Sequence, residues 1–134
     1  MKKFFAMMMC MMLLVGSCLM VACSSEENTE EDSFAVGAIY INSQNDTAGY
    51  TFAHHQGITK AMEALGLDVQ TDLYIVDNVP EDDQQVKDAI DTLAGKGCDI
   101  IFGISFGYIN AMNEAAQEYP DIIFSHGTGY MSND

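Results

Sequence analysis

From residue 34 onward, the chain alternates short, apolar runs with longer stretches in which apolar residues recur every three or four positions. The short runs have the length of β-strands, and strands that are apolar throughout are typical of a sheet buried on both faces. They cover residues 34–41, about 68–76, 98–104 and 122–125. The longer stretches predict three helices. The first covers about 50–65, the second begins within 80–83 and ends at Gly95 or Gly97, and the third covers about 105–119.

Each predicted helix has recognisable ends and one apolar stripe. Gly66 follows the first helix where a C-cap glycine is common, Pro80 and three acidic residues open the second, and Pro120 stops the third. The residues expected to face the core are Ala53, Gly57, Ile58, Ala61 and Leu65, then Val86, Ala89, Ile90 and Leu93, then Ile109, Met112, Ala116 and Tyr119.

This βαβαβαβ order predicts the α/β class, with a parallel sheet covered by helices on both faces. We expect the flavodoxin-like strand order 2-1-3-4. Ligands of such sheets bind beyond the carboxyl ends of the strands, near the point where the strand order reverses. The candidate site is therefore formed by three loops, residues 42–50, 105–108 and 126–130.

The first 22 residues have the pattern of an export signal, because two lysines precede an uncharged apolar run over residues 4–22. A run of this length could also stay in the membrane as an anchor. Residues 19–23, Leu-Met-Val-Ala-Cys, resemble a bacterial lipoprotein box. This predicts a lipoprotein signal peptide over 1–22 and lipidation of Cys23. Cys18 is a second candidate, but its use would leave apolar residues 19–22 on the mature chain.

Residues 23–33 are polar and acidic without apolar periodicity, which predicts a disordered tether. The expected location is the extracytoplasmic face of the cell membrane, where the lipid anchor holds the protein. Cys10 and Cys18 lie in the predicted leader and Cys23 carries the lipid, so Cys98 is left alone and no disulfide is expected. We expect Cys98 to be a small buried hydrophobic residue.

The charge beyond the leader is strongly negative: all 20 acidic residues follow Ala22, against three lysines and no arginine, a formal charge of −17. Nucleic acid is excluded as a partner, because its binding needs basic residues that displace counterions from phosphates. Anionic ligands are disfavoured, because the arginine fork that grips carboxylates and phosphates is absent.

One motif suggests an enzyme. Residues 103–107, Gly-Ile-Ser-Phe-Gly, fit the nucleophile elbow of α/β-hydrolases, with Ser105 as nucleophile and Asp121 and His126 following in order. However, Asp121 and His126 fall at opposite ends of one predicted strand, about 16 Å apart. The alternative role of Ser105 is a helix N-cap. No catalytic residue is therefore predicted.

Metal and cofactor signals are weak. His54 and His55 are adjacent on a helix, where neighbouring side chains point about 100° apart and cannot chelate one ion together. The glycines at 127 and 129 lack the rest of a dinucleotide fingerprint, and no P-loop lysine is present. No cofactor and no metal site is expected.

Aromatic residues gather at the candidate edge: Tyr50, Phe106, Tyr108 and Tyr130 all fall in or beside its loops. They predict a stacking site for a flat, uncharged molecule. Asp46, Ser105, His126 and Thr128 are the candidate hydrogen-bonding residues.

Five stretches together resemble the basic membrane protein family, the PnrA-like substrate-binding lipoproteins of ABC transporters. They are VGAIYI at 36–41, DTAGYTFAHHQG at 46–57, YIVDNVPE at 74–81, DIIFGISFGY at 99–108 and YPDIIFSHGTGY at 119–130. The resemblance covers residues 34–134. It implies a type I periplasmic-binding fold of two α/β lobes that close on a purine nucleoside or nucleobase and deliver it to an ABC permease.

The resemblance also implies site residues. Tyr50 matches the aromatic that stacks on the base, Asp46 lies in the polar loop before it, and Thr51 follows it in the same motif. Ser105 and Phe106 match the loop after the third strand that lines the cleft. His126 matches the polar position after the fourth strand, with Thr128 beside it.

Relatives have a second lobe, so residues 34–134 are expected to form an N-terminal lobe only and the chain is expected to be a fragment. Because closure of two lobes buries the ligand in this class, we expect weak or undetectable binding by this chain alone. The alternatives are a ligand-sensing or regulatory lipoprotein of the same fold and, less favoured, a serine hydrolase that uses Ser105.

Overall fold

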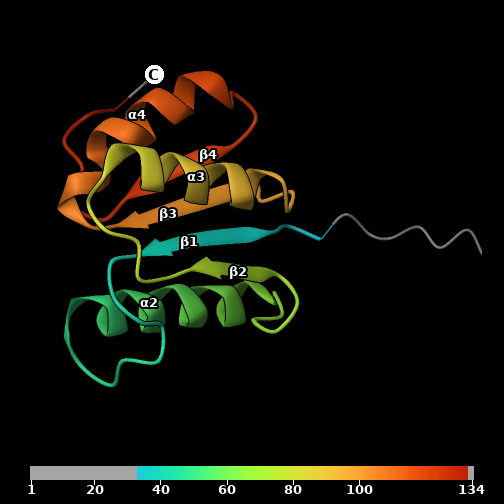
Figure 1. The fold of residues 1–134 in the computed structure, drawn as a ribbon. Coiled ribbons are helices and arrows are strands. Elements are labelled where there is room, and N and C mark those ends of the chain that lie inside the picture. The colour runs from blue at the N-terminus through green and yellow to red at the C-terminus, as the bar shows by residue number, and fades with distance from the viewer. Residues whose placement is uncertain (1–32, 133–134) are drawn as a thin grey trace, which may run out of the picture. The chain divides into compact units, whose positions relative to one another are not determined.

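The computed structural model describes residues 33–132 (Figure 1). Its elements, labelled as in Figure 1, are β1 (Val36–Tyr40), α2 (Gly49–Leu65), β2 (Leu73–Val76), α3 (Asp83–Ala94), β3 (Ile100–Ile104), the 3-10 helix η1 (Phe106–Tyr108), α4 (Ile109–Glu118) and β4 (Ile123–His126). Within the described residues, no helix is both long and apolar enough to cross a bilayer. The predicted signal peptide, Cys23 and nearly all of the tether lie outside the described residues.

The four strands form one parallel sheet in the order β2-β1-β3-β4, which confirms the predicted order. Val36 of β1 pairs with Leu73 of β2 on one side and with Ile100 of β3 on the other. Helix α2 covers one face of the sheet, and α3 with α4 covers the opposite face (Figure 1). The prediction of helices on both faces is confirmed.

The face under α3 and α4 is closely packed. All four residues of the predicted α3 stripe are buried, and they pack with residues such as Ile39, Ile101, Ala111 and Met112. Gly103 of β3 permits this approach, because a Cβ there would lie only 1.9 Å from Met112 Sδ. Cys98 is buried in the same cluster, as expected, and burial raises the pKa of its thiol to about 11, with a smaller contribution from Asp99.

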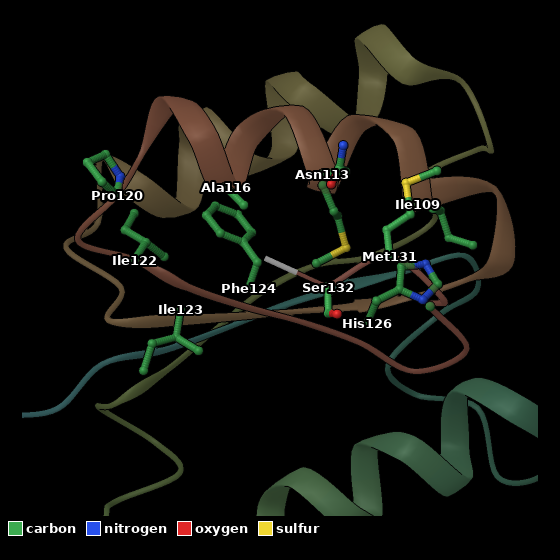
Figure 2. Close-up of a pocket in the computed structure, with 12 residues that line it drawn as sticks. Ile109, Asn113, Ala116, Pro120, Ile122, Ile123, Phe124, His126, Met131 and Ser132 are labelled. Atoms are coloured by element: carbon green, nitrogen blue, oxygen red, sulfur yellow. The ribbon is translucent and has the colours of Figure 1, made fainter. Parts of the chain in front are cut away.

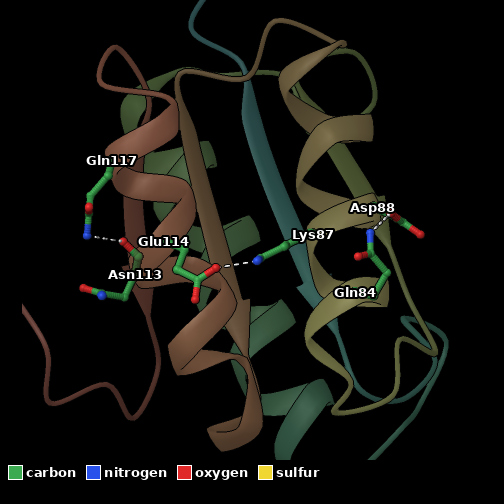
Figure 3. Close-up of polar contacts among 6 residues, drawn as sticks. All are labelled: Gln84, Lys87, Asp88, Asn113, Glu114 and Gln117. Atoms are coloured by element: carbon green, nitrogen blue, oxygen red, sulfur yellow. Dashed lines mark hydrogen bonds and ion pairs between the residues drawn. The ribbon is translucent and has the colours of Figure 1, made fainter.

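The outer surface of these two helices is polar. Lys87 of α3 forms an ion pair with Glu114 of α4, and Gln84 donates to Asp88 within α3 at 2.8 Å (Figure 3). Exposed pairs of this kind contribute little to stability, because water and salt screen them. The apolar contacts beneath them therefore hold the helices to the sheet.

The stripe predicted for α2 is largely wrong. Only Thr51, Ile58 and Met62 are buried on this helix, and Leu65 is 77% exposed. Ile58 and Met62 pack on β1, whereas Ala53, Gly57 and Ala61 line an open groove beside Phe102 and Ser125. These three small residues are exposed because an open groove separates this part of α2 from β3 and β4.

Three predicted boundaries also need correction. The second strand begins at Leu73 rather than at about 68, because Asp72 holds the preceding segment in a turn: its carboxylate accepts from Asp68 N and Thr71 Oγ1, both at 2.9 Å. Helix α3 begins after Asp82, whose side chain caps Gln85 N at 3.1 Å. The third helix starts with η1 and becomes α-helical only from Ile109.

Candidate functional site

The carboxyl ends of the strands meet at one edge of the sheet, where the loops are fastened to one another. Val79 N, after β2, donates to Tyr40 O at the end of β1, at 3.0 Å. Gln44 N, in the β1–α2 loop, donates to Asp77 Oδ2 at 2.8 Å. Asn78 lies between these contacts with a positive φ of 55°. The predicted site is therefore built on a connected set of loops.

Tyr50 stands in the first turn of α2 and lies against the end of β4. Gly49 before it has a φ of 90°, a conformation that glycine adopts readily. The Tyr50 ring contacts the His54 ring edge-on, with centroids 4.4 Å apart. A Cβ on Gly127 would lie 3.1 Å from Tyr50 Oη and 3.2 Å from His54 Cε1. The fold thus brings together Tyr50 and the β4 loop, as the sequence predicts, and adds His54, which no sequence pattern assigned to the site.

Two predicted residues of the first loop are placed differently. Thr51 is 1% exposed, and its Oγ1 is buried without a hydrogen-bond partner. Asp46 is half-exposed in the β1–α2 loop, where its backbone nitrogen donates to Ser43 O at 3.1 Å. The open ring of Tyr50, 41% exposed, is therefore the clearest contact surface of this loop.

The β3–η1 turn presents one exposed aromatic ring above buried neighbours. Phe106 is 66% exposed, whereas Ser105 is 5% exposed. Tyr108, counted among the edge aromatics from the sequence, is fully buried, and its hydroxyl donates to Val79 O at 2.5 Å. Burial raises the pKa of Tyr108, with a smaller effect of the Glu81 charge. Tyr108 is therefore a core residue, and Phe106 is the aromatic that this turn offers to solvent.

Glu81 is a residue of this edge that the sequence assigned only to a helix start. Its Oε1 accepts from Ser105 Oγ at 2.5 Å and from Gly107 N at 2.8 Å. These bonds, that from Ser105 first, lower the pKa of Glu81 and keep it ionised at neutral pH. Ser105 occupies the N-cap position of η1, but its side chain makes no capping bond there. No sequence pattern links Glu81 to a serine 24 positions away.

His126 ends β4 with an unusual hydrogen-bond arrangement. Its Nδ1 accepts from Thr128 N at 3.0 Å, so the proton of the neutral ring is on Nε2. Nε2 is buried without a hydrogen-bond partner of normal geometry. Burial lowers the pKa of His126, and the neighbouring backbone of Ser105 opposes part of this shift. The ring is therefore a neutral group with one unused donor.

The cavity beside His126 has a volume of about 420 Å³. It extends under α4 along β4, with Ile109 and Ala116 above and Phe124 and His126 below (Figure 2). Met131 and Ser132 of the last described segment close it on the His126 side (Figure 2). Of the predicted ligand residues, only His126 lines this cavity, so the cavity and the aromatic edge are two distinct features.

Neither a hydrolase triad nor a metal cluster is formed by these groups. Ser105 Oγ donates to Glu81 rather than to a histidine, while Asp121 precedes β4 and His126 ends it. Among residues 33–132, no group of three or more His, Cys, Asp or Glu side chains could hold a metal ion. The edge thus offers aromatic faces and hydrogen-bonding groups.

Comparison of the chain with known proteins identifies its family. Residues 34–134 match the family described as ABC transporter substrate-binding protein PnrA-like. The chain belongs to this family. A purine-binding protein of Brucella abortus is 36% identical over 104 residues, and a Haloferax volcanii protein named as an ABC transporter glucose-binding protein is 30% identical over 106.

The matched region is a small part of these two relatives. It takes in 78% and 79% of this chain but 29% and 26% of the relatives. A solved ABC transporter solute-binding protein of Conexibacter woesei has the same fold, with a TM-score of 0.55 at 24% identity, covering 69% of this chain and 28% of that protein. A solute-binding protein of Aeropyrum pernix has it too, with a TM-score of 0.59 at 16% identity, covering 75% of this chain and 26% of that protein. The sheet order and these two neighbours establish a lobe of the type I periplasmic-binding fold.

Proposed function

We propose that this chain forms the first lobe of the extracytoplasmic substrate-binding component of an ABC importer, and that its ligand is a purine nucleoside or nucleobase. The observation that carries the proposal is the family match over residues 34–134. The ligand class is supported by the purine-binding relative, which is 36% identical. Under this proposal the partners are a small molecule and a membrane permease, and no reaction is catalysed.

The chemistry of the edge suits such a ligand. Tyr50, Phe106 and Tyr130 are exposed by 41%, 66% and 73%, and aromatic rings of this kind stack on flat bases. The three lysines beyond the leader, Lys60, Lys87 and Lys96, all lie outside the loops of this edge. An uncharged base or nucleoside is therefore a better match than a nucleotide, whose phosphates would find no cation there.

Sugars are the second ligand class, because one relative is named as a glucose-binding protein and aromatic rings also stack on sugars. Saturation-transfer NMR on the full chain with adenosine, guanosine, hypoxanthine and glucose separates the classes. Purine signals without glucose signals support the proposal. Glucose signals alone, or none from any purine, contradict it.

We further propose that the ligand is enclosed only when a second lobe closes over this edge, because the relatives are more than three times as long as the matched region. The 134-residue chain should then bind purines weakly. Isothermal titration with adenosine, guanosine and free purines tests this. Micromolar affinity of the chain by itself would contradict it.

Anchoring is a separate part of the proposal. Lipid on Cys23, after removal of residues 1–22, would hold the protein on the outer face of the membrane through the acidic tether, residues 23–33. Incorporation of labelled palmitate should be lost in Cys23→Ser and kept in Cys18→Ser. The reverse result would move the lipid site to Cys18, and labelling of neither would refute the lipoprotein assignment.

A further inference from the structure

The β3–η1 turn that carries Phe106 is held on both sides by a single oxygen atom. Glu81 Oε1 accepts from Ser105 Oγ at 2.5 Å and from the Gly107 backbone nitrogen at 2.8 Å. These donors belong to the two sequence neighbours of Phe106. The backbone that carries the exposed ring is thus fixed before and after it.

The loop that carries Glu81 is itself anchored. Val79 N donates to Tyr40 O at the end of β1, at 3.0 Å. Val79 O accepts from the hydroxyl of Tyr108, the last residue of η1, which is fully buried. Glu81 therefore reaches the turn from a rigid support.

Gly107 is shaped to accept this carboxylate. A Cβ at position 107 would lie 2.6 Å from both Cβ and Cδ of Glu81. Non-bonded carbon atoms do not approach one another this closely, so a larger residue at 107 would push Glu81 away. The Glu81 carboxylate can therefore occupy this position only because residue 107 is a glycine.

The contact between Glu81 and the β3–η1 turn affects the exposed ring of Phe106. Phe106 is 66% exposed, so few contacts of its own fix its position. Ordering a side chain and its loop at the moment of binding reduces affinity, and prior ordering avoids that loss. We propose that Glu81 is a positioning residue that holds Phe106 ready to stack on the ligand without touching the ligand itself. This inference rests on the proposed function, because it assumes that a ligand stacks at this edge.

Three variants separate positioning from general stability. Glu81→Gln keeps an oxygen that can accept both hydrogen bonds, whereas Glu81→Ala removes it. Asp82→Ala is the matched control: it removes the α3 cap on Gln85 N, which costs about 1 kcal/mol of folding free energy, but leaves the turn unchanged. A purely structural role would make the two alanine variants behave alike.

The first readout needs no ligand. The chain contains no tryptophan, so Phe106→Trp introduces a single fluorescent reporter on the turn. In the full chain, time-resolved anisotropy should show faster local motion when Glu81→Ala is added. Glu81→Gln and Asp82→Ala should leave the motion unchanged. Equal motion in all four proteins would overturn the inference.

The second readout is the affinity for adenosine of chains that keep Phe106. It is measured by an amide chemical-shift titration of the full chain. Glu81→Ala should weaken binding about tenfold, a difference of about 1.4 kcal/mol, and Glu81→Gln should restore it. Equal weakening in Asp82→Ala would overturn the inference. If neither the unchanged chain nor any variant binds adenosine, the proposed ligand is refuted. Faster tryptophan motion in Glu81→Ala would in that case still support the role of Glu81 in holding the turn.

Discussion

The two faces of the sheet differ in how completely they are covered. Under α3 and α4, residues such as Ile90, Leu93 and Ile101 are at most 1% exposed. On the α2 side, Ile58 and Met62 are buried, but Ile123 is 58% exposed at the uncovered β4 edge. The α3–α4 side therefore has the larger buried cluster, and the α2 side has a second, smaller one with an open groove beside β3 and β4. Ligand recognition is proposed for the edge where both faces end.

The largest expected effect comes from deleting side-chain volume on the closed face. Ile90→Ala should lower the free energy of unfolding by about 2–5 kcal/mol, because it leaves a cavity in a packed core. Leu65→Ala, on the open side, should change it by less than about 0.5 kcal/mol, because Leu65 is 77% exposed. Denaturant unfolding measures both. Similar losses would mean that the two faces do not differ as described.

Replacing a glycine by alanine, which adds one methyl group, should have opposite effects on the two sides of the sheet. Gly103→Ala should cost about 1–3 kcal/mol, because its Cβ would meet Met112 Sδ at 1.9 Å. Gly57→Ala should instead stabilise the chain by about 0.5–1 kcal/mol, because glycine in a helix interior is unfavourable and nothing lies within 4 Å of the added Cβ. Thermal unfolding of the two variants should therefore shift in opposite directions. Shifts in the same direction would contradict this account of the faces.

The smallest effect concerns His126 at the edge. Burial lowers its pKa in the folded chain below 6.5, so the unfolded chain binds the proton more readily. Stability from the neutral ring is present above pH 6.5 and is lost as the pH falls below it. NMR titration of the ring should give a pKa below 6.5, and His126→Gln should reduce the loss of stability on acidification. A ring pKa above 6.5 would show that Nε2 has found an acceptor.

Local patterns predicted the closed face well and the open face poorly. The α3 stripe of Val86, Ala89, Ile90 and Leu93 is buried throughout, because a helix packed fully on a sheet must bury one stripe. The prediction that Leu65 of α2 is buried was wrong. Periodicity shows which residues of a helix are apolar, but it does not show how much of the sheet lies beneath each of them. The strand order followed from the alternation of strands and helices, which needs no side-chain detail.

The candidate site was predictable only in part. Tyr50, Ser105, Phe106 and His126 lie at the predicted edge, because the ends of parallel strands must meet there. Their binding roles stay predictions. The burial of Tyr108 and the contact of Glu81 with the β3–η1 turn depend on three-dimensional packing between loops far apart in the sequence. No spacing rule encodes such contacts.

The central claim is that a purine ligand binds at the aromatic edge of this lobe. An amide chemical-shift map of the full chain, titrated with adenosine to millimolar concentration, tests it most directly. We predict saturable shifts confined to residues 42–51, 105–108 and 126–130, and their loss in Tyr50→Ala. Shifts that are absent, that follow the cavity under α4 instead, or that persist unchanged in Tyr50→Ala would contradict the claim.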